Sequence, residues 1–329
     1  MKLLVVGGAG YIGSVVAAQL IEAGHTVTVA DNLSKGHDWA VPPEATFVQV
    51  DVLDAPALTE VVAGGFDGVL HFAALSLVGE SVTEPVRYFR TNVAGTLNLL
   101  DAIRSAGVER LVFSSTAATY GEPEDVPILE TAATVPTNPY GASKLAVDMA
   151  IGAECAAAAG ADRAFGATSL RYFNVAGASG NYGELHDPET HLIPLVLRVA
   201  AGLRESVQIY GTDYPTEDGT AVRDYIHVED LARAHLLALE AITPGTHAIY
   251  NLGNGTGFSV RQVVEACRAV TGHEIPAIEV GRRAGDPAVL VASSDKIRRA
   301  LGWVPEKPAL EDMVGDAWAW IQANRHRHG

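Results

Sequence analysis

Near its amino terminus the chain reads Gly7-Gly8-Ala9-Gly10-Tyr11-Ile12-Gly13. This stretch directly follows the apolar run 2–6 and opens a segment, 11–24, whose apolar residues have helical spacing. Glycines there allow a tight turn and let backbone amides approach a pyrophosphate at the positive end of the helix. A glycine-rich turn between a strand and a helix therefore predicts a dinucleotide-binding site.

Asp31 is the acidic residue expected to accompany this turn. It ends the second predicted strand, 18 residues after Gly13. A carboxylate that binds the adenosine ribose stands about 20 residues after such a turn. It favours NAD over NADP, although the nearby Lys35 leaves an opening for a 2′-phosphate. The competing interpretation of Asp31 is a solvated residue at a strand end.

Strand-like and helix-like segments alternate through the first half of the chain. Apolar strand candidates lie at 25–30, 46–50, 68–73, 110–114 and 166–171, and helical stretches lie near 85–106 and 140–159. This alternation is typical of a parallel sheet covered by helices on both faces. The sequence therefore predicts an α/β fold, a doubly wound parallel sheet (Rossmann fold) with a smaller carboxyl-terminal lobe.

The pattern changes after about residue 174, where loops rich in Gly, Pro, Asp and Thr appear. We therefore expect residues 1–174 to form the dinucleotide-binding domain and residues 175–329 to form mainly a substrate-binding lobe. The strand-like segment 249–253 predicts that the chain crosses back into the sheet near 221–253.

Charge and composition limit the possible partners. The 329 residues are 48% hydrophobic, and their net charge of −16 argues against a nucleic-acid or anionic-membrane partner. Of the 23 Lys and Arg residues, 15 follow residue 165, which suits an anionic small molecule held in the second half. No apolar stretch is long enough for a membrane span, and the amino terminus reads as a strand rather than a signal peptide. We therefore expect a cytoplasmic protein.

Metal-binding patterns are the next class to consider. The two cysteines, Cys155 and Cys267, are spaced neither as a CxxC pair nor as zinc ligands, and the 11 histidines form no HExxH or close cluster with them. The sequence therefore predicts no metal site.

Tyr140 and Lys144 lie four residues apart in a helical stretch that follows Pro139, so their side chains share one face. A tyrosine with a pKa near 10 is a weak base, and a neighbouring ammonium favours the phenolate and so lowers that pKa. Thr116 follows a predicted strand, where its hydroxyl can donate to a substrate oxygen or, alternatively, cap the next helix. We expect this trio to be catalytic.

Further stretches carry a family resemblance. They are Asp31–Ser34, His71–Ala74, Val78–Ser81, Pro139–Lys144, Leu170–Asn174 and, most specifically, Asp213–His227. With the glycine-rich turn they resemble the extended short-chain dehydrogenase/reductase family, and within it the epimerases of sugar nucleotides, over essentially the whole chain. The resemblance implies tightly bound NAD and an isomerase of galactose metabolism. Such an enzyme interconverts UDP-galactose and UDP-glucose through a transient 4-keto sugar nucleotide.

The resemblance also implies residue roles. Tyr140 takes the proton of the sugar 4-hydroxyl, Thr116 hydrogen-bonds to that hydroxyl, and Lys144 holds the nicotinamide ribose and tunes Tyr140. The implied cofactor contacts are Gly7, Gly10, Tyr11, Ile12, Gly13, Asp31, Asn32, Leu33, Ser34, Lys35, Gly36, Asp51, Val52, Phe72, Ala73, Ala74, Ser76, Thr91, Ser114, Tyr140, Lys144 and Phe173. The implied substrate contacts are Thr116, Tyr140, Asn174, His191, Leu192, Gln208, Ile209, Tyr210, Arg223, Arg283, Asp286 and Leu290. The helices near 85–106 and 140–159 resemble the surface through which family members form homodimers.

Three positions depart from the family pattern. Ser76 replaces a lysine of many members, and Thr91 replaces the first residue of an Asn-Asn pair. The binding of the cofactor is therefore expected to differ from that in those members. Leu290 aligns with a residue that limits sugar size, tyrosine in stricter members. A leucine predicts room for some N-acetylated sugar.

Several other functions remain possible. A dehydratase fits less well, because Ala117-Ala118 stand where such enzymes have an acidic pair. A 4-epimerase of UDP-glucuronate or of a UDP-N-acetylhexosamine is harder to distinguish. A non-catalytic NAD-binding sensor would keep the glycine-rich turn but would not need Tyr140 and Lys144.

Overall fold

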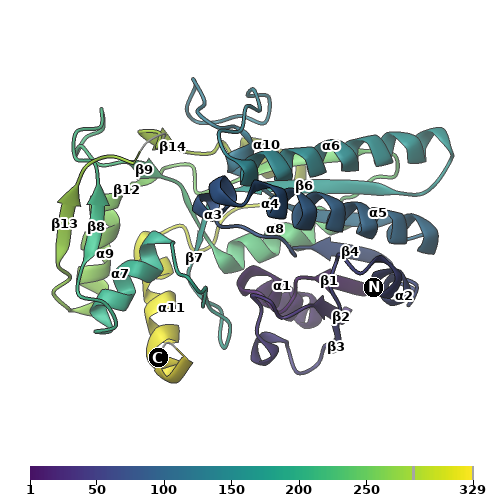
Figure 1. Ribbon diagram of the computed structural model, residues 1–329, viewed down its shortest axis with the longest axis horizontal. Coiled ribbons are helices and arrows are strands. Elements are labelled where there is room, and N and C mark those ends of the chain that lie inside the picture. The colour runs from purple at the N-terminus through teal and green to yellow at the C-terminus, as the bar shows by residue number, and fades with distance from the viewer. Residues whose placement is uncertain (284–285, 328–329) are drawn as a thin grey trace.

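The computed structural model describes residues 1–283 and 286–327. Its main layer is a seven-stranded parallel sheet with the strand order β11-β6-β5-β4-β1-β2-β3 (Figure 1). The strands are β1 (Lys2–Val6), β2 (Thr26–Asp31), β3 (Thr46–Gln49), β4 (Gly68–His71), β5 (Arg110–Thr116), β6 (Gly166–Tyr172) and β11 (His247–Leu252). The predicted α/β fold with a parallel sheet is confirmed, and each strand candidate of the first half lies within two residues of its predicted position.

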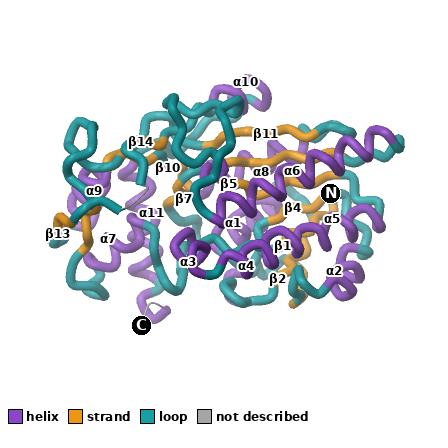
Figure 2. Tube along the Cα trace, turned by 45° about the horizontal axis from the view of Figure 1, so that its top comes forward, coloured by secondary structure: helices purple, strands orange, loops and turns teal. Residues whose placement is uncertain are grey.

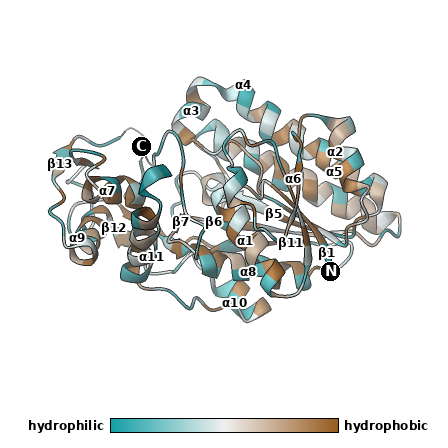
Figure 3. Cartoon of the chain, turned by 90° about the horizontal axis from the view of Figure 1, so that it is seen from below, coloured by the Kyte–Doolittle hydropathy of each residue, from teal (hydrophilic) through white to brown (hydrophobic). Residues whose placement is uncertain are grey.

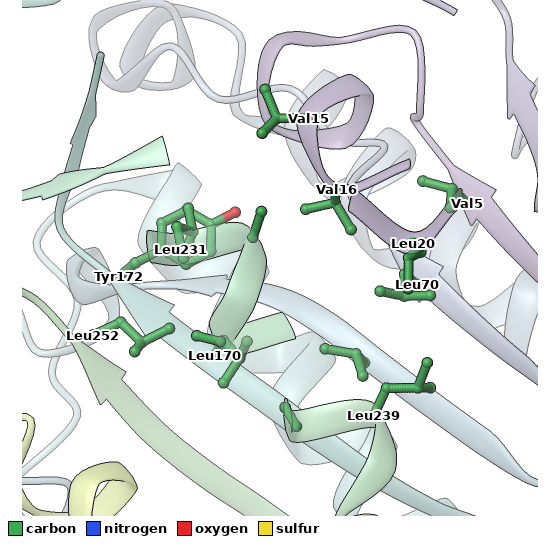
Figure 4. Close-up of a cluster of buried hydrophobic side chains, with 14 of the residues drawn as sticks. Val5, Val15, Val16, Leu20, Leu70, Leu170, Tyr172, Leu231, Leu239 and Leu252 are labelled. Atoms are coloured by element: carbon green, nitrogen blue, oxygen red, sulfur yellow. The ribbon is translucent and has the colours of Figure 1, made fainter. Parts of the chain in front are cut away.

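Helices cover both faces of this sheet, as expected from strands that are apolar on both sides. One face carries α1 (Tyr11–Glu22) and α8 (Val228–Glu240), and the other carries α2 (Ala55–Val62), α5 (Gly95–Ala106) and α6 (Pro139–Gly160). Figure 3 shows α2 and α5 on one side of the strands and α8 on the other. Figure 4 shows the first of the two cores, in which Val16 and Leu20 of α1 face Leu231 and Leu239 of α8.

Three shorter helical elements precede helix α5. They are α3 (Val78–Thr83), α4 (Pro85–Tyr88) and a π-helical segment, η2 (Phe89–Ala94), which leads into α5. The helical stretch predicted near 85–106 is confirmed, since α4, η2 and α5 follow one another without a break, and it departs from a regular α-helix only in the π-helical turn. The wider π turn holds Asn92, whose buried side chain bonds to backbone and side-chain groups outside the helix. Such π segments occur frequently at functional sites.

A second, smaller lobe packs around its own core (Figure 1). Its strands are β7 (Asn174–Ala176), β8 (Val207–Tyr210), β9 (Val222–Arg223), β10 (Tyr225–His227), β12 (Phe258–Ser259), β13 (Ala277–Val280) and β14 (Val289–Leu290). Its helices are α7 (Leu192–Ala200), α9 (Val260–Thr271) and α11 (Leu310–Ala323). The strands form three small sheets, β10-β7, β12-β9-β14 and β13-β8. In Figure 2 the long strands of the main sheet (orange) run side by side away from this lobe.

The chain passes between the two parts more than once. After β8, β9 and β10 it returns to the main sheet through α8 and β11, and β11 pairs with β6 along its whole length. It then re-enters the lobe at β12 and packs α10 (Asp295–Leu301) near β11. The remaining short helical turns are η1 (Asp38–Ala40), η3 (Ala117–Thr119) and η4 (Arg325–Arg327). Across the part of the chain described here, no helix combines the length and apolarity needed to cross a membrane.

Candidate active site

The glycine-rich turn lies between β1 and α1, as predicted. Gly7 has a φ of +83°, and a Cβ atom there would lie 2.4 Å from the backbone nitrogen of Ala73. A Cβ on Gly13 would lie 2.3 Å from the carbonyl oxygen of Gly7. Gly10 is the N-cap of α1 and supplies no side-chain cap, so the first amides of the helix stay available to a ligand. This cradle fits the pyrophosphate of a dinucleotide.

The predicted ribose-binding residues lie at the ends of β2 and β3, beside this turn. Asp31 Oδ2 accepts a hydrogen bond from the Ala9 amide at 3.1 Å, and Oδ1 accepts one from the Leu33 amide at 2.8 Å. Burial raises the pKa of Asp31, and these backbone bonds oppose the rise. Asn32 Nδ2 donates to Asp51 Oδ2 at 2.8 Å, which joins the two strand ends. Lys35 Nζ donates to the carbonyl of Asp187 at 2.5 Å.

Tyr140 and Lys144 project from the first turns of α6 toward the carboxyl end of β5. Pro139 is the first helical residue, and the side chain of Asn138 caps the helix by accepting from the Gly141 amide at 2.8 Å. Lys144 Nζ donates to the carbonyl of Ser114 at 2.8 Å. The Thr116 side chain lies close enough to the Tyr140 phenol to lower its pKa. Four predicted residues of α6 and β5 thus meet at one place.

Burial dominates the protonation of this pair. It raises the pKa of Tyr140, and the Thr116 side chain opposes the rise. It also lowers the pKa of Lys144 to about 7, against the attraction of Asp148. The sequence-based expectation of a lowered tyrosine pKa is therefore wrong for the protein without ligands, because burial of the phenol itself outweighs the groups that favour the phenolate.

A buried ion pair that the sequence analysis missed lies one helical turn beyond Lys144. Asp148 Oδ2 accepts from Nε of Arg171 at 3.0 Å, from its Nη2 at 2.9 Å and from the Ser115 hydroxyl at 3.0 Å. Both charged side chains are at most 4% exposed. Arg171 Nη1 also donates to Tyr120 Oη at 3.0 Å. An acid at i+4 from Lys144 on the buried face of a helix was the available signal.

Asn92 is a second residue that the sequence analysis missed. Its Nδ2 donates to the carbonyl of Leu75 at 3.0 Å and to the Ser143 hydroxyl at 2.9 Å, and its Oδ1 accepts from the Leu75 amide at 2.8 Å. It therefore ties the loop after β4 to α6, the helix that carries Tyr140 and Lys144. The neighbouring Thr91 is half-buried, whereas Ser76 is exposed.

The predicted substrate residues of the lobe gather around β8, β9 and β14. Arg223 Nη2 bonds to Asp286 Oδ1 at 2.6 Å, and the Arg283 guanidinium lies 4.0 Å from the centre of the Tyr210 ring. Leu290 on β14 pairs in register with Arg223 on β9. Two arginines and an aromatic ring in this part of the lobe suit a nucleoside diphosphate.

The remaining substrate candidates lie between the lobe and the main sheet. Asn174 begins β7 and donates to the carbonyl of Asp224 at 2.9 Å, while His191 is the N-cap residue of α7 and Leu192 its first residue. Ile209 differs from the rest, since it is only 3% exposed and leaves little of its side chain for a ligand.

Comparison with known proteins agrees with this geometry. Residues 3–253 match the model of the NAD dependent epimerase/dehydratase family. The chain is 60% identical to a UDP-glucose 4-epimerase of Corynebacterium glutamicum, with 98% of this chain and 96% of the relative covered. It is 59% identical to one of Streptomyces lividans, with 97% and 95% covered.

Solved structures give the same result. The UDP-glucose-4-epimerase from Stenotrophomonas maltophila, with bound NAD and formylated UDP-arabinopyranose, has a TM-score of 0.93 and 41% identity, and 99% of each chain is covered. The UDP-glucose 4-epimerase from Bifidobacterium longum, in complex with NAD+ and UDP, has a TM-score of 0.91 and 36% identity, with 99% of this chain and 100% of the other covered.

Proposed function

Because this chain belongs to the NAD-dependent epimerase/dehydratase family, we propose that it is an isomerase that interconverts UDP-galactose and UDP-glucose with NAD as its cofactor. The observation that carries this proposal is the meeting of Tyr140, Thr116 and Lys144 at the carboxyl end of β5. A proton acceptor, a hydroxyl donor and an ammonium at that edge are what oxidation of a sugar hydroxyl requires.

The residues of this site divide the work. The glycine-rich turn and the acidic strand ends at Asp31 and Asp51 would hold NAD, which supplies hydride transfer when bound. Tyr140 Oη accepts the proton of the sugar 4-hydroxyl, and Thr116 Oγ1 orients that hydroxyl. Protonated Lys144, one turn further along α6, stabilises the phenolate. Tyr140 returns the proton once the 4-keto sugar has turned its other face.

The lobe would hold the uridine diphosphate. Arg223 on β9 and Arg283 beside Tyr210 are the cations proposed to bind the diphosphate, because a guanidinium binds a phosphate through two parallel hydrogen bonds. Holding the nucleotide at a distance from Tyr140 lets the sugar rotate while the substrate stays bound.

Proton NMR of the anomeric signals tests this function directly. Purified protein is incubated with UDP-galactose and no added NAD. We expect UDP-glucose to grow to a constant ratio, which requires that NAD stays bound through purification. The Tyr140→Phe variant should lose about 100-fold to 10,000-fold in rate, the usual contribution of general acid–base catalysis. A Tyr250→Phe variant on β11 serves as the matched control and should keep the wild-type rate.

No turnover by the wild-type protein, even after NAD is supplied, would contradict the proposed substrate pair. UDP-glucuronate and UDP-N-acetylglucosamine would then be tried in the same assay. Retained turnover in Tyr140→Phe would contradict the role of the tyrosine.

We also propose that the protein is a cytoplasmic homodimer. Apolar side chains stand exposed on α4, η2, α5 and α6, among them Val86, Phe89, Leu97 and Met149, and α5 packs beside α6. An exposed apolar face of this kind marks an association surface. Light scattering should give twice the chain mass of 34.5 kDa, and Leu97→Glu should reduce it toward that mass. Both cysteines are free, as is usual in a reducing compartment.

A further inference from the structure

Four side chains with metal-ligand chemistry converge on the loop between β7 and α7. Glu184, His186, Glu189 and His191 each place one ligand atom within 4.8 Å of the others. They come from a single stretch of eight residues with the spacing Glu-x-His-x-x-Glu-x-His. Neither the dinucleotide site nor the catalytic trio uses these donors, and His191 is the one member of the group that is also a predicted substrate contact.

The contacts within the cluster share atoms. Glu184 Oε1 lies 2.7 Å from His186 Nδ1 and 2.8 Å from His191 Nδ1, and His191 Nδ1 also lies 2.8 Å from Glu189 Oε1. One carboxylate oxygen therefore faces two imidazole nitrogens, and one imidazole nitrogen faces two carboxylate oxygens. The Glu184 and Glu189 side chains are 8% and 1% exposed.

Backbone amides hold Glu189 in place, since its Oε1 accepts from the amides of Thr190 at 2.7 Å and His191 at 2.8 Å, but the two carboxylates compete for one imidazole nitrogen. An imidazole Nδ1 carries at most one hydrogen, so His191 cannot make two full bonds to two carboxylates. Two buried carboxylates also need positive charge close by. A divalent cation bound at the centre would meet both needs, since all four atoms could face it at once.

We propose that Glu184, His186, Glu189 and His191 form a binding site for one divalent transition-metal ion, of which zinc fits best. Two imidazole nitrogens and two carboxylate oxygens make a complete four-coordinate ligand set for that ion. Bonds of about 2.0–2.2 Å to a tetrahedral ion separate its ligands by about 3.3 Å. The paired atoms would thus move apart by about 0.5 Å, which small rotations of four side chains on one loop allow.

The surroundings of the site indicate a structural role. The same loop accepts hydrogen bonds from Tyr11 Oη to the Gly177 carbonyl at 2.6 Å and from Lys35 Nζ to the Asp187 carbonyl at 2.5 Å. His37 Nε2 lies 3.2 Å from the carbonyl of Leu185. The loop therefore rests on the predicted cofactor-binding residues and ends at the first turn of α7. A bound ion would fix this contact between the main sheet and the lobe.

This proposal departs from the prediction that the chain has no metal site. That prediction considered only histidines and cysteines in standard metal-binding spacings. In this cluster, carboxylates supply half of the donors. It does not depend on which sugar nucleotide the enzyme uses.

Metal titration of the intact protein tests the site. Two histidines near the carboxyl terminus, His326 and His328, could bind metal themselves, so the experiment uses a His326→Ala/His328→Ala background. After chelator treatment, Co²⁺ is titrated in while its visible absorption is followed, and Zn²⁺ is used to displace it. We expect one equivalent with the spectrum of a tetrahedral ion. His186→Ala and Glu184→Gln should each weaken binding at least about 10-fold.

The matched control is His273→Ala, which removes an exposed histidine near the end of α9. It should bind Co²⁺ like the parent. Equal binding by the parent, His186→Ala and Glu184→Gln would overturn the proposal, as would absence of saturable binding in the parent. Bound NAD and circular dichroism report whether each variant is folded.

A second measurement needs no variant. Crystals of the wild-type protein grown with zinc chloride should show an anomalous peak at the zinc edge among the four side chains. A map without that peak would overturn the proposal even if every variant failed to fold.

Discussion

Asp148 is the charged neighbour of Lys144, and its position suggests that it tunes the lysine. Its carboxylate raises the pKa of Lys144, which burial lowers to about 7. In Asp148→Asn the pKa of Lys144 should fall further. As the pH is raised, the variant would then lose its ammonium, and with it activity, at a lower pH than the wild-type protein. The alkaline limb of the kcat profile should therefore move to lower pH. Arg171 would also lose its buried partner, at a cost of about 3–5 kcal/mol in unfolding free energy.

Glu154→Gln is the matched control for Asp148→Asn. Glu154 lies on the same helix and is ion-paired with Arg104 and Arg163. Its loss should destabilise the protein and leave the pH profile in place. If both variants leave the profile unchanged, Asp148 supports the fold and does not act on Lys144.

Leu290 is the residue expected to admit larger sugars. It lies on β14 beside Arg223, so a bulkier side chain would narrow the predicted substrate site. Leu290→Tyr should lower kcat/KM for UDP-N-acetylglucosamine by about 10-fold or more, because a difference in pocket size discriminates between substrates by this order. The kcat/KM for UDP-galactose should change little. A coupled assay with both sugars measures the ratio. Equal losses with both sugars would count against a role in size selection.

At the scale of elements, α6 positions the proposed catalytic residues Tyr140 and Lys144. Its first turn is fixed by the Asn138 cap, two residues before Tyr140. Asn138→Ala should lower the unfolding free energy by about 1 kcal/mol and also reduce kcat, because Tyr140 lies in the turn that frays. Asn138→Asp keeps the cap and should restore both. Urea unfolding and initial rates are the measurements. A loss of stability with an unchanged kcat would show that fraying does not reach Tyr140.

The sequence predicted those elements whose conformation is set by residues close to one another in the chain. The glycine-rich turn, the alternation of strands and helices, and the Pro139–Lys144 helix start all arise from neighbouring residues. The two-residue strands β9, β12 and β14 could not be predicted, because their pairing joins residues far apart in the chain. Asn92 escaped notice for the same reason, since its partners, Leu75 and Ser143, are distant in sequence.

For the whole molecule, buried histidines predict acid sensitivity. Burial lowers the pKa of His71 to about 3 and that of His235 to about 4. Because the unfolded chain takes up these protons near pH 6.5, unfolding free energy should fall as pH drops from 6.5 toward 4. The slope is about 1.4 kcal/mol per pH unit for each proton.

His235→Phe tests this dependence. His235 packs 4.9 Å from the ring of Phe72, so a phenyl group suits its surroundings. The variant should flatten the pH dependence by up to about 1.4 kcal/mol per unit, measured by urea unfolding at several pH values. His326→Phe, at an exposed position, should leave the slope unchanged. An unaltered slope in His235→Phe would show that other groups cause the acid sensitivity.

The return of the chain to the main sheet at β11 has a consequence for biosynthesis. Strand β6 can pair with β11 only after residues 247–252 have been synthesised, and much of the lobe is synthesised before them. Until then a nascent chain presents an open strand edge, which invites pairing with other chains. Translation therefore cannot release the cofactor-binding part as a finished unit. A ribosome-stalled or truncated product ending near residue 174 should depend on chaperones, whereas in the complete chain β11 pairs with β6 along its whole length.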